Sequence, residues 1–165
     1  MSSVYISQGE IAVGQAEDMV ISTILGSCIS MCLWDPVAGV GGMNHLLLPE
    51  MRSSGDQVSS GAVAMDRLIN EMMHLGAERP RLRAKLFGGS SMLSGRTDIG
   101  ARNAEFGRAY LKNENIPCDA ESLGGTQARR LRYWPKTGSA KMKFVEEAPV
   151  LEKPVVVAAN DVELF

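Results

Sequence analysis

The chain has 165 residues and a mass of 17.8 kDa, enough for one domain with a single substantial core. Apolar residues make up 45% and charged residues 22% of the chain, an ordinary globular composition that argues against disorder. The formal net charge of -2 argues against a nucleic-acid binder, and no apolar run approaches the roughly 20 residues that span a bilayer.

The N-terminus and the cysteine count predict a reducing compartment. The first ten residues, MSSVYISQGE, lack the basic and apolar regions of a signal peptide, so we expect a cytoplasmic protein that is not inserted in a membrane. Thiols are kept reduced in the cytoplasm, and three cysteines are an odd number. A disulfide framework is therefore not expected.

Short strands are predicted along the first 48 residues. Runs of β-forming residues, separated by Gly and acidic residues, occupy positions 4–6, 11–13 and 19–25. Apolar and polar residues then alternate over 29–34, and the following DPVAG has Pro and Gly where a tight turn needs them. Because an apolar run returns at 40–48, we predict a β-hairpin over residues 28–48.

Two helices are predicted in the rest of the chain. After a polar loop at 51–56, apolar residues recur at three- and four-residue spacing from 58 to 75, and Gly76 follows as a C-cap. A second helix is expected over 99–115, with Ile99, Asn103, Phe106, Tyr110 and Leu111 as its inner stripe.

The predicted fold class is α/β of the α+β type, a layered sandwich of mostly antiparallel strands with two main helices. Four further strands are expected at 82–87, 118–123, 128–134 and 141–145. The last twenty residues carry two prolines and five acidic side chains, so we expect an acidic tail outside the core. We therefore predict a domain over 1–146 and a C-terminal tail over 147–165.

A zinc site is the first chemistry to weigh against these cysteines. Structural zinc needs four ligands, usually two paired knuckles. Cys28 and Cys32 are three residues apart, but Cys118 has no cysteine near it and His45 and His74 are far apart in sequence. The sequence therefore predicts no metal site.

A cysteine nucleophile with a histidine base fits the pattern better. Gly26 and Ser27 precede Cys28, and a sharp turn there would present the thiol beside free backbone N–H groups of Ser27 and Cys28 that could stabilise an oxyanion. Counted from the predicted turn, His45 pairs approximately with Ser30 and lies diagonal to Cys28. A small core cysteine and an unrelated histidine remain the alternative.

The other thiols and the second histidine have ordinary interpretations. Cys32 lies mid-strand between apolar residues, and Cys118 opens an edge-like strand, so we predict packing roles for both. His74 falls at the polar end of the first helix, where we expect it to be solvated.

The segment LGSCISMCLWDPVAGVGGMNHLLLP resembles the signature of the CheD family, the chemoreceptor glutamine deamidases of bacterial and archaeal chemotaxis. The likeness continues through KLFGGSSML, IGARN and LGGTQARRLRYWPKTG, and it covers roughly residues 3–146. The histidine 17 positions after the LGSC cysteine makes the combination specific.

This resemblance implies a fold related to the catalytic domain of the cytotoxic necrotizing factor toxins and a Cys–His thioester mechanism. It places the nucleophile on Cys28 and the base on His45, with no metal or organic cofactor. The family's third residue, a threonine hydroxyl six positions before the cysteine, falls on Ser22, with Thr23 beside it. In a strand these two side chains point to opposite faces, so one of them alone can orient the imidazole.

The resemblance also implies partners. The substrate would be glutamines on the cytoplasmic helices of chemoreceptors, and a CheC-type phosphatase is a second expected partner. We expect loops at 51–57 and 88–94 to shape the substrate groove. Two other classes stay open: another cysteine amidohydrolase with the same dyad, and a non-catalytic adaptor that binds receptor or phosphatase.

Overall fold

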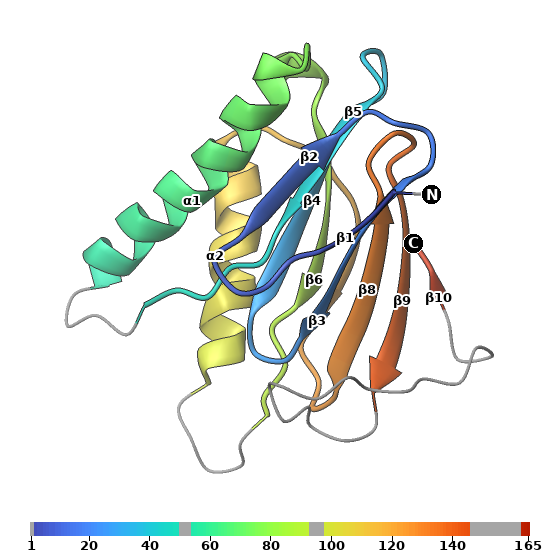
Figure 1. Cartoon of the computed structure of the whole chain (residues 1–165). Coiled ribbons are helices and arrows are strands. Elements are labelled where there is room, and N and C mark those ends of the chain that lie inside the picture. Colours follow the sequence, from blue (N-terminus) through green and yellow to red (C-terminus); the bar gives the residue numbers. More distant parts are fainter. Residues whose placement is uncertain (1, 50–53, 93–97, 146–162) are drawn as a thin grey trace.

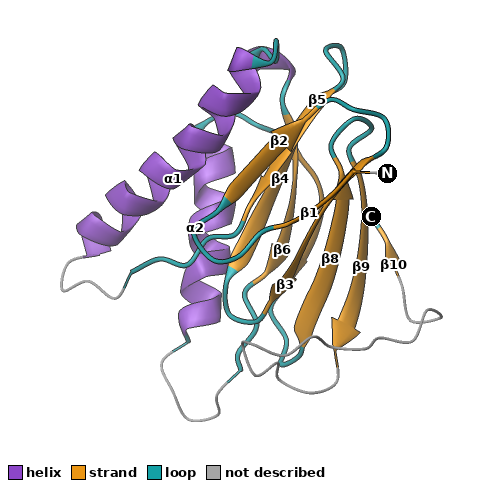
Figure 2. Ribbon diagram, viewed as in Figure 1, coloured by secondary structure: helices purple, strands orange, loops and turns teal. Residues whose placement is uncertain are grey.

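The computed structural model describes residues 2–49, 54–92, 98–145 and 163–165, without the side chains of 54–59. These residues form three layers: two helices, then one five-stranded sheet, then a second five-stranded sheet (Figures 1 and 2). Both helices lie on the same side of the first sheet, so that sheet is covered on both faces. Neither described helix is long and apolar enough to cross a membrane.

Sheet B is the middle layer, and its strands follow the order β2-β5-β4-β6-β7. All of its neighbours are antiparallel except β6 and β7, which run parallel. Its strands are β2 (Ile11–Gly14), β4 (Ile29–Asp35), β5 (Val40–Asn44), β6 (Arg83–Gly88) and β7 (Cys118–Leu123). β4 is therefore the central strand of the sheet that carries the predicted hairpin.

Sheet A is the outer layer, and its strands follow the order β1-β3-β8-β9-β10. β1 and β3 are parallel, and the remaining neighbours are antiparallel. Its strands are β1 (Ser2–Tyr5), β3 (Met19–Leu25), β8 (Ala128–Trp134), β9 (Ser139–Val145) and β10 (Glu163–Leu164). The chain passes from sheet A to sheet B between β3 and β4, where the predicted nucleophile lies.

The helices are α1 (Ser54–His74) and α2 (Ile99–Asn113), with a short 3-10 turn, η1 (Arg79–Arg81), after the first. α1 ends where predicted, because Gly76 has a φ of 104°, which favours glycine. α2 begins at an N-cap, where the carboxylate of Asp98 accepts a hydrogen bond of 2.9 Å from the N–H of Ala101.

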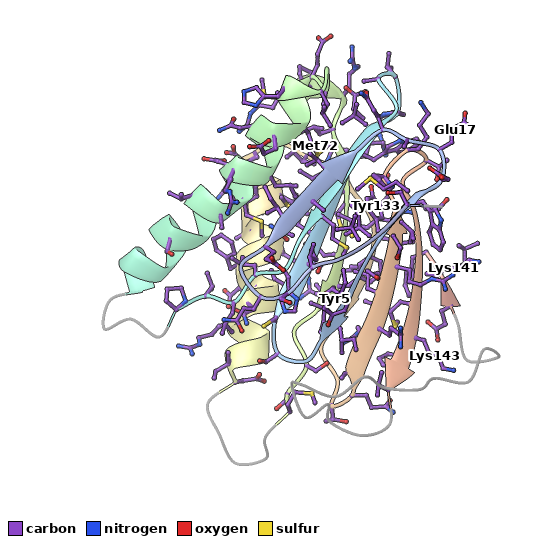
Figure 3. The ribbon with its side chains drawn as sticks, viewed as in Figure 1. Tyr5, Glu17, Met72, Tyr133, Lys141 and Lys143 are labelled. Carbon is purple, nitrogen blue, oxygen red and sulfur yellow. The ribbon has the colours of Figure 1, made fainter. Side chains whose placement is uncertain are left out.

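Two apolar cores separate the layers. The core between the helices and sheet B contains Met72 of α1, and the core between the sheets contains Tyr133 of β8 (Figure 3). Alternation along β4 serves both, because Ile29 and Met31 face the helices whereas Cys32 faces sheet A. The face of β4 that carries Cys28 is therefore the one between the two sheets.

The predicted α+β class and the mostly antiparallel sheets are confirmed. The expectation that the whole tail lies outside the core is wrong for its last residues. Glu163 and Leu164 pair with β9, and the Phe165 ring packs on Phe87 at a centroid distance of 5.1 Å. A two-residue strand is too short to show a periodic pattern in the sequence. Residues 146–162 lie outside the described residues.

Candidate active site

The turn at residues 26–28 links the two sheets and is held through its carbonyl groups. The Gly26 carbonyl accepts a hydrogen bond of 3.0 Å from the Ser90 N–H, and the Cys28 carbonyl accepts one of 2.8 Å from the Gly89 N–H. Gly88 must be glycine, because its φ is 111° and a Cβ would lie 2.1 Å from the Cys28 oxygen. The loop after β6 thus holds the turn through these two backbone hydrogen bonds.

The third carbonyl of the turn is held by a side chain. The Ser27 carbonyl accepts a hydrogen bond of 2.8 Å from the side-chain amide of Asn103 on α2. All three carbonyls of the turn are therefore occupied, whereas the backbone N–H groups of Ser27 and Cys28 donate to none of the described residues. Two adjacent N–H groups that donate to no described residue, beside a thiol, are an arrangement that could stabilise an oxyanion.

A buried arginine supports the loop that grips the turn. The Arg129 guanidinium donates to the Ser90 hydroxyl at 2.7 Å, to the Gly88 carbonyl at 3.2 Å and to the Ser122 hydroxyl at 3.0 Å. The residue is 2% exposed, and burial lowers its pKa. Arg129 was not among the predicted site residues, because its role depends on a loop that is distant in sequence.

The register of the hairpin brings His45 close to the turn. Ile29 pairs with Leu46 through two backbone hydrogen bonds of 2.9 and 2.7 Å. In an antiparallel pair this register sets His45 opposite Ser30 and diagonal to Cys28, as the count from the turn predicted. The thiol of Cys28 makes no side-chain hydrogen bond to the described residues, and catalytic contacts of this kind often close when substrate binds.

His45 is oriented by Thr23 of β3. The Thr23 hydroxyl lies 2.7 Å from Nδ1 of His45 and donates a hydrogen bond of 2.7 Å to the Ile6 carbonyl. A hydroxyl carries one proton, so once that proton is given to Ile6 the oxygen must accept from an Nδ1–H of the imidazole. This tautomer leaves Nε2 unprotonated and able to accept a proton.

The preference for Ser22 as the contact of His45 is corrected by this geometry. Thr23 is fully buried and lies on the face of β3 that points at sheet B, whereas Ser22 lies on the opposite face and is half-buried. Strand alternation allows one of the two to reach the imidazole, and the side chain that reaches it is Thr23.

Burial keeps both members of the candidate dyad neutral at pH 7. It raises the pKa of the Cys28 thiol to about 11. It also lowers the pKa of His45 to about 4, although the charge of Glu10 and a hydrogen bond with the Ile6 backbone oppose the shift. The resting pair is therefore a thiol and a neutral imidazole, and a nucleophilic role for Cys28 would require proton transfer to accompany the attack.

The remaining cysteines and His74 lie away from this site. Cys32 is buried in the core between the sheets, as predicted. Cys118 is exposed on the edge strand β7, so the packing role predicted for it is wrong. His74 is exposed at the end of α1. Among the described residues, no group of three or more Cys, His, Asp or Glu side chains is arranged to hold a metal ion.

The two loops expected to shape the substrate groove have different outcomes. Residues 54–57 belong to α1, so the predicted loop at 51–57 is shorter than expected, and 50–53 lie outside the described residues. Part of the 88–94 loop lies beside the turn through Gly89 and Ser90, and 93–94 lie outside the described residues. A cavity of about 180 Å³ lies next to that loop, between the start of α2 and Gly124–Gly125.

Two buried polar residues at the site were not assigned a role from the sequence. Asn103 stood in the predicted apolar stripe of α2, where a polar side chain signals a specific partner, but the partner was not visible. Ser30 lies opposite His45 and is fully buried, and its hydroxyl makes no hydrogen bond to the described residues.

Comparison with known proteins points to one family. The family model described as CheD chemotactic sensory transduction matches residues 47–144. A relative from Caulobacter vibrioides is 44% identical over 98% of this chain and 92% of its own length, and one from Zymomonas mobilis is 48% identical over 97% and 91%. Both are named "Probable chemoreceptor glutamine deamidase CheD".

Similarity to solved structures is much lower. One aligned crystal structure is that of a Neisseria meningitidis protein assigned to the DUF152 family model. The alignment has a TM-score of 0.46 and 10% sequence identity, and it covers 76% of this chain and 63% of the Neisseria protein. The expected likeness to the cytotoxic necrotizing factor domain stays a prediction.

Proposed function

The chain belongs to the CheD family, and from that premise we propose that it is a chemoreceptor glutamine deamidase. It converts selected glutamine side chains on the cytoplasmic helices of chemoreceptors to glutamate and releases ammonia, and in this way it tunes chemotaxis. The support is of two kinds: the names carried by relatives that are 43–48% identical, and the chemistry available at the 26–28 turn.

The observation that carries the proposal is the contact of the Thr23 hydroxyl with Nδ1 of His45. This contact supports a neutral imidazole with a free Nε2 on the side of the hairpin where Cys28 lies. A thiol with a raised pKa needs such a base, because few thiolates form at pH 7 without one.

Acylation begins when the Cys28 sulfur attacks the side-chain carbonyl carbon of the receptor glutamine. His45 Nε2 takes the thiol proton as the C–S bond forms, and the carbonyl oxygen becomes a tetrahedral oxyanion. The imidazolium then gives that proton to the amide nitrogen, the C–N bond breaks, and ammonia leaves. The product of this stage is a thioester between Cys28 and the receptor side chain.

Deacylation repeats the sequence with water. His45 Nε2 removes a proton from water while its oxygen attacks the thioester carbon. Collapse of the second tetrahedral intermediate expels the Cys28 sulfur, which recovers its proton from the imidazolium. The receptor now carries glutamate. In both stages the oxyanion is stabilised by the free N–H groups of Ser27 and Cys28.

The experiment is mass spectrometry of a recombinant chemoreceptor cytoplasmic fragment incubated with the chain in ordinary water and in H2¹⁸O. Each modified glutamine should gain about 1 Da in ordinary water and about 3 Da in H2¹⁸O, because water supplies the new oxygen. Binding without a mass change would favour the adaptor alternative. Incorporation of an added primary amine in preference to water would indicate another cysteine amidohydrolase chemistry.

A CheC-type phosphatase stays a predicted second partner. The mass assay tests it indirectly if a purified CheC-type protein is added. A partner that occupies the receptor-binding surface should slow deamidation in proportion to its occupancy, whereas an unrelated protein at the same concentration should leave the rate unchanged.

A further inference from the structure

We propose that Asn103 is a positioning residue: its side-chain amide fixes the peptide between Ser27 and Cys28 so that the Cys28 N–H faces the oxyanion of the reacting glutamine. The proposal rests on the deamidase function above and deepens it, because it assigns a residue of α2 to the oxyanion site. Neither the strand pattern nor the dyad requires this residue.

Asn103 makes two hydrogen bonds that join separate parts of the site. Its Nδ2 donates to the Ser27 carbonyl at 2.8 Å, and its Oδ1 accepts from the Leu48 N–H at 3.0 Å. The side chain has no exposed surface. One buried amide therefore ties the 26–28 turn to the segment that follows His45, and each bond uses a different atom.

Because a peptide group is planar, the hydrogen bond from Asn103 to the Ser27 carbonyl also fixes the direction of the Cys28 N–H, the proposed oxyanion donor. In a trans peptide the carbonyl of one residue and the N–H of the next point in opposite directions. When Asn103 holds the Ser27 carbonyl toward α2, the Cys28 N–H must point away from α2. That N–H donates to none of the described residues, so it is free to bind the substrate oxygen.

The direction away from α2 is the side on which the thiol lies. The inner stripe of α2 packs in the core between the helices and sheet B, through residues such as Phe106 and Leu111. Cys28 packs against the other core, between the two sheets. The N–H that points away from α2 therefore lies on the same side of the turn as the Cys28 sulfur, where the tetrahedral carbon forms.

Of the three described hydrogen bonds to the turn's carbonyls, the one from Asn103 comes from a side chain, so a substitution can remove it. Backbone N–H groups of Ser90 and Gly89 hold the neighbouring carbonyls of Gly26 and Cys28. The central carbonyl of the three depends on a side chain. Asn103→Asp keeps an oxygen that can accept from Leu48 but has no N–H for Ser27, so it separates the two bonds.

The test compares wild-type, Asn103→Ala and Asn103→Asp on a chemoreceptor cytoplasmic fragment. We expect kcat to fall about 10- to 100-fold in both variants, with KM within about twofold of wild-type. A displaced oxyanion donor lowers the stabilisation of the transition state more than it lowers the affinity for substrate. A receptor peptide with an aldehyde in place of the glutamine amide should bind both variants correspondingly more weakly, since its adduct with the thiol carries the same oxyanion.

Alkylation of Cys28 by iodoacetamide is the control, because displacement of iodide forms no oxyanion. Its rate, followed on the Cys28 peptide, should stay within about twofold of wild-type, and circular dichroism measures the folded fraction of each variant. If Asn103→Ala does not fold, Asn103→Asp, which keeps an acceptor for Leu48, supplies the same comparison.

The outcomes of this test are distinct. The positioning role would be overturned if the variants kept the wild-type kcat and the wild-type affinity for the aldehyde peptide. It would also be overturned if the rate of Cys28 alkylation fell by as much as kcat. A third result would overturn the positioning role as well: loss of activity in Asn103→Ala together with full activity in Asn103→Asp. That result would mean that the hydrogen bond from the Leu48 N–H, and not the one to Ser27, supports activity. Failure of the proposed function is seen separately, as a wild-type chain that leaves receptor glutamines unchanged.

Discussion

The Thr23 hydroxyl lies 2.7 Å from Nδ1 of His45, and this contact joins β3 of sheet A to the segment that follows β5 of sheet B. Thr23 also donates to the Ile6 carbonyl at 2.7 Å. The imidazole is thus fixed in orientation and in tautomer by one buried side chain, while Cys28, the proposed nucleophile, lies on the turn that connects the same two sheets.

The first prediction concerns that hydroxyl. Thr23→Val keeps the shape of the side chain but cannot accept from Nδ1–H, so turnover should fall about ten- to a hundredfold. Thr23→Ser should restore most of the loss. Ser22→Ala is the matched control, and it should stay close to wild-type because Ser22 lies on the opposite face of β3. Deamidation of receptor fragments at equal folded concentration measures all three, and a greater loss in Ser22→Ala would return the role to Ser22.

The second prediction assigns the base. His45→Ala should lower kcat by about 10²- to 10⁴-fold, the usual effect of losing a general acid–base group. His74→Ala is the control, since His74 is exposed at the end of α1. Equal losses in the two variants, or a loss in His45→Ala that follows the fraction unfolded by circular dichroism, would contradict the catalytic role.

The third prediction concerns pH. His45 acts as a base when it is neutral, and its pKa of about 4 keeps it neutral well below the ordinary histidine range. The acid limb of kcat/KM should therefore lie near pH 4 to 5, with activity lost as the pH falls through that range. Ammonia release measured from pH 3 to 9 follows it. An acid limb between pH 6 and 7 would show that burial does not depress the pKa of His45.

The thiol gives a fourth prediction, again from burial. Because the pKa of Cys28 is raised to about 11, the thiolate fraction increases with every step in pH from 7 to 10. Alkylation of Cys28 by iodoacetamide should rise continuously over that range and reach no plateau. A plateau below pH 8 would mean that the pair rests as thiolate and imidazolium, and the two ionisations would then belong to the pair as a whole.

The fifth prediction concerns the stability of the hairpin that carries the candidate dyad. The carboxylate of Asp35 is fully buried and accepts hydrogen bonds from Arg81 and from the N–H groups of Val37, Ala38 and Glu78. Burial alone would raise its pKa, but these partners lower it to about 2. Asp35→Ala should lower the free energy of unfolding by about 2–4 kcal/mol, because several buried donors lose their partner.

The stabilisation by Asp35 has a pH window. Its folded pKa is depressed below that of the unfolded chain, so the contribution is present above about pH 4 and is lost as the pH falls toward 2. Urea unfolding at pH 7 and at pH 3 should show a smaller difference between wild-type and Asp35→Ala at the lower pH. Asp119→Ala, which breaks an exposed pair with Arg83, is the control and should change little.

Much of the site's framework follows from local patterns in the sequence. The hairpin is predictable from three features: the alternation of residues 29–34, the DPVAG turn and the apolar run at 40–48. The position of the turn sets the pairing register of the two strands. Counting from that turn placed His45 opposite Ser30, and the pairing of Ile29 with Leu46 has the same register. Contacts within one hairpin are predictable because few residues separate the partners.

Contacts between the sheets were not predictable in this way. Both faces of β3 carry apolar residues, with Ile21 and Leu25 on one and Val20 and Ile24 on the other, so the pattern does not say whether Ser22 or Thr23 points inward. Asn103 meets Ser27 across 76 positions, and no local rule links them. The sequence analysis placed Asn103 in the inner stripe of the second helix, and its buried partner is seen only in the tertiary arrangement.

The central claim is that a receptor glutamine is hydrolysed through a bond to Cys28, and one comparison tests it most directly. Receptor fragments are incubated with wild-type, Cys28→Ala and Cys32→Ala, and the mass gain per glutamine is followed over time. Cys28→Ala should give no gain and Cys32→Ala should keep activity in its folded fraction, because Cys32 is buried in the core. Deamidation by Cys28→Ala at a rate near wild-type would contradict the account.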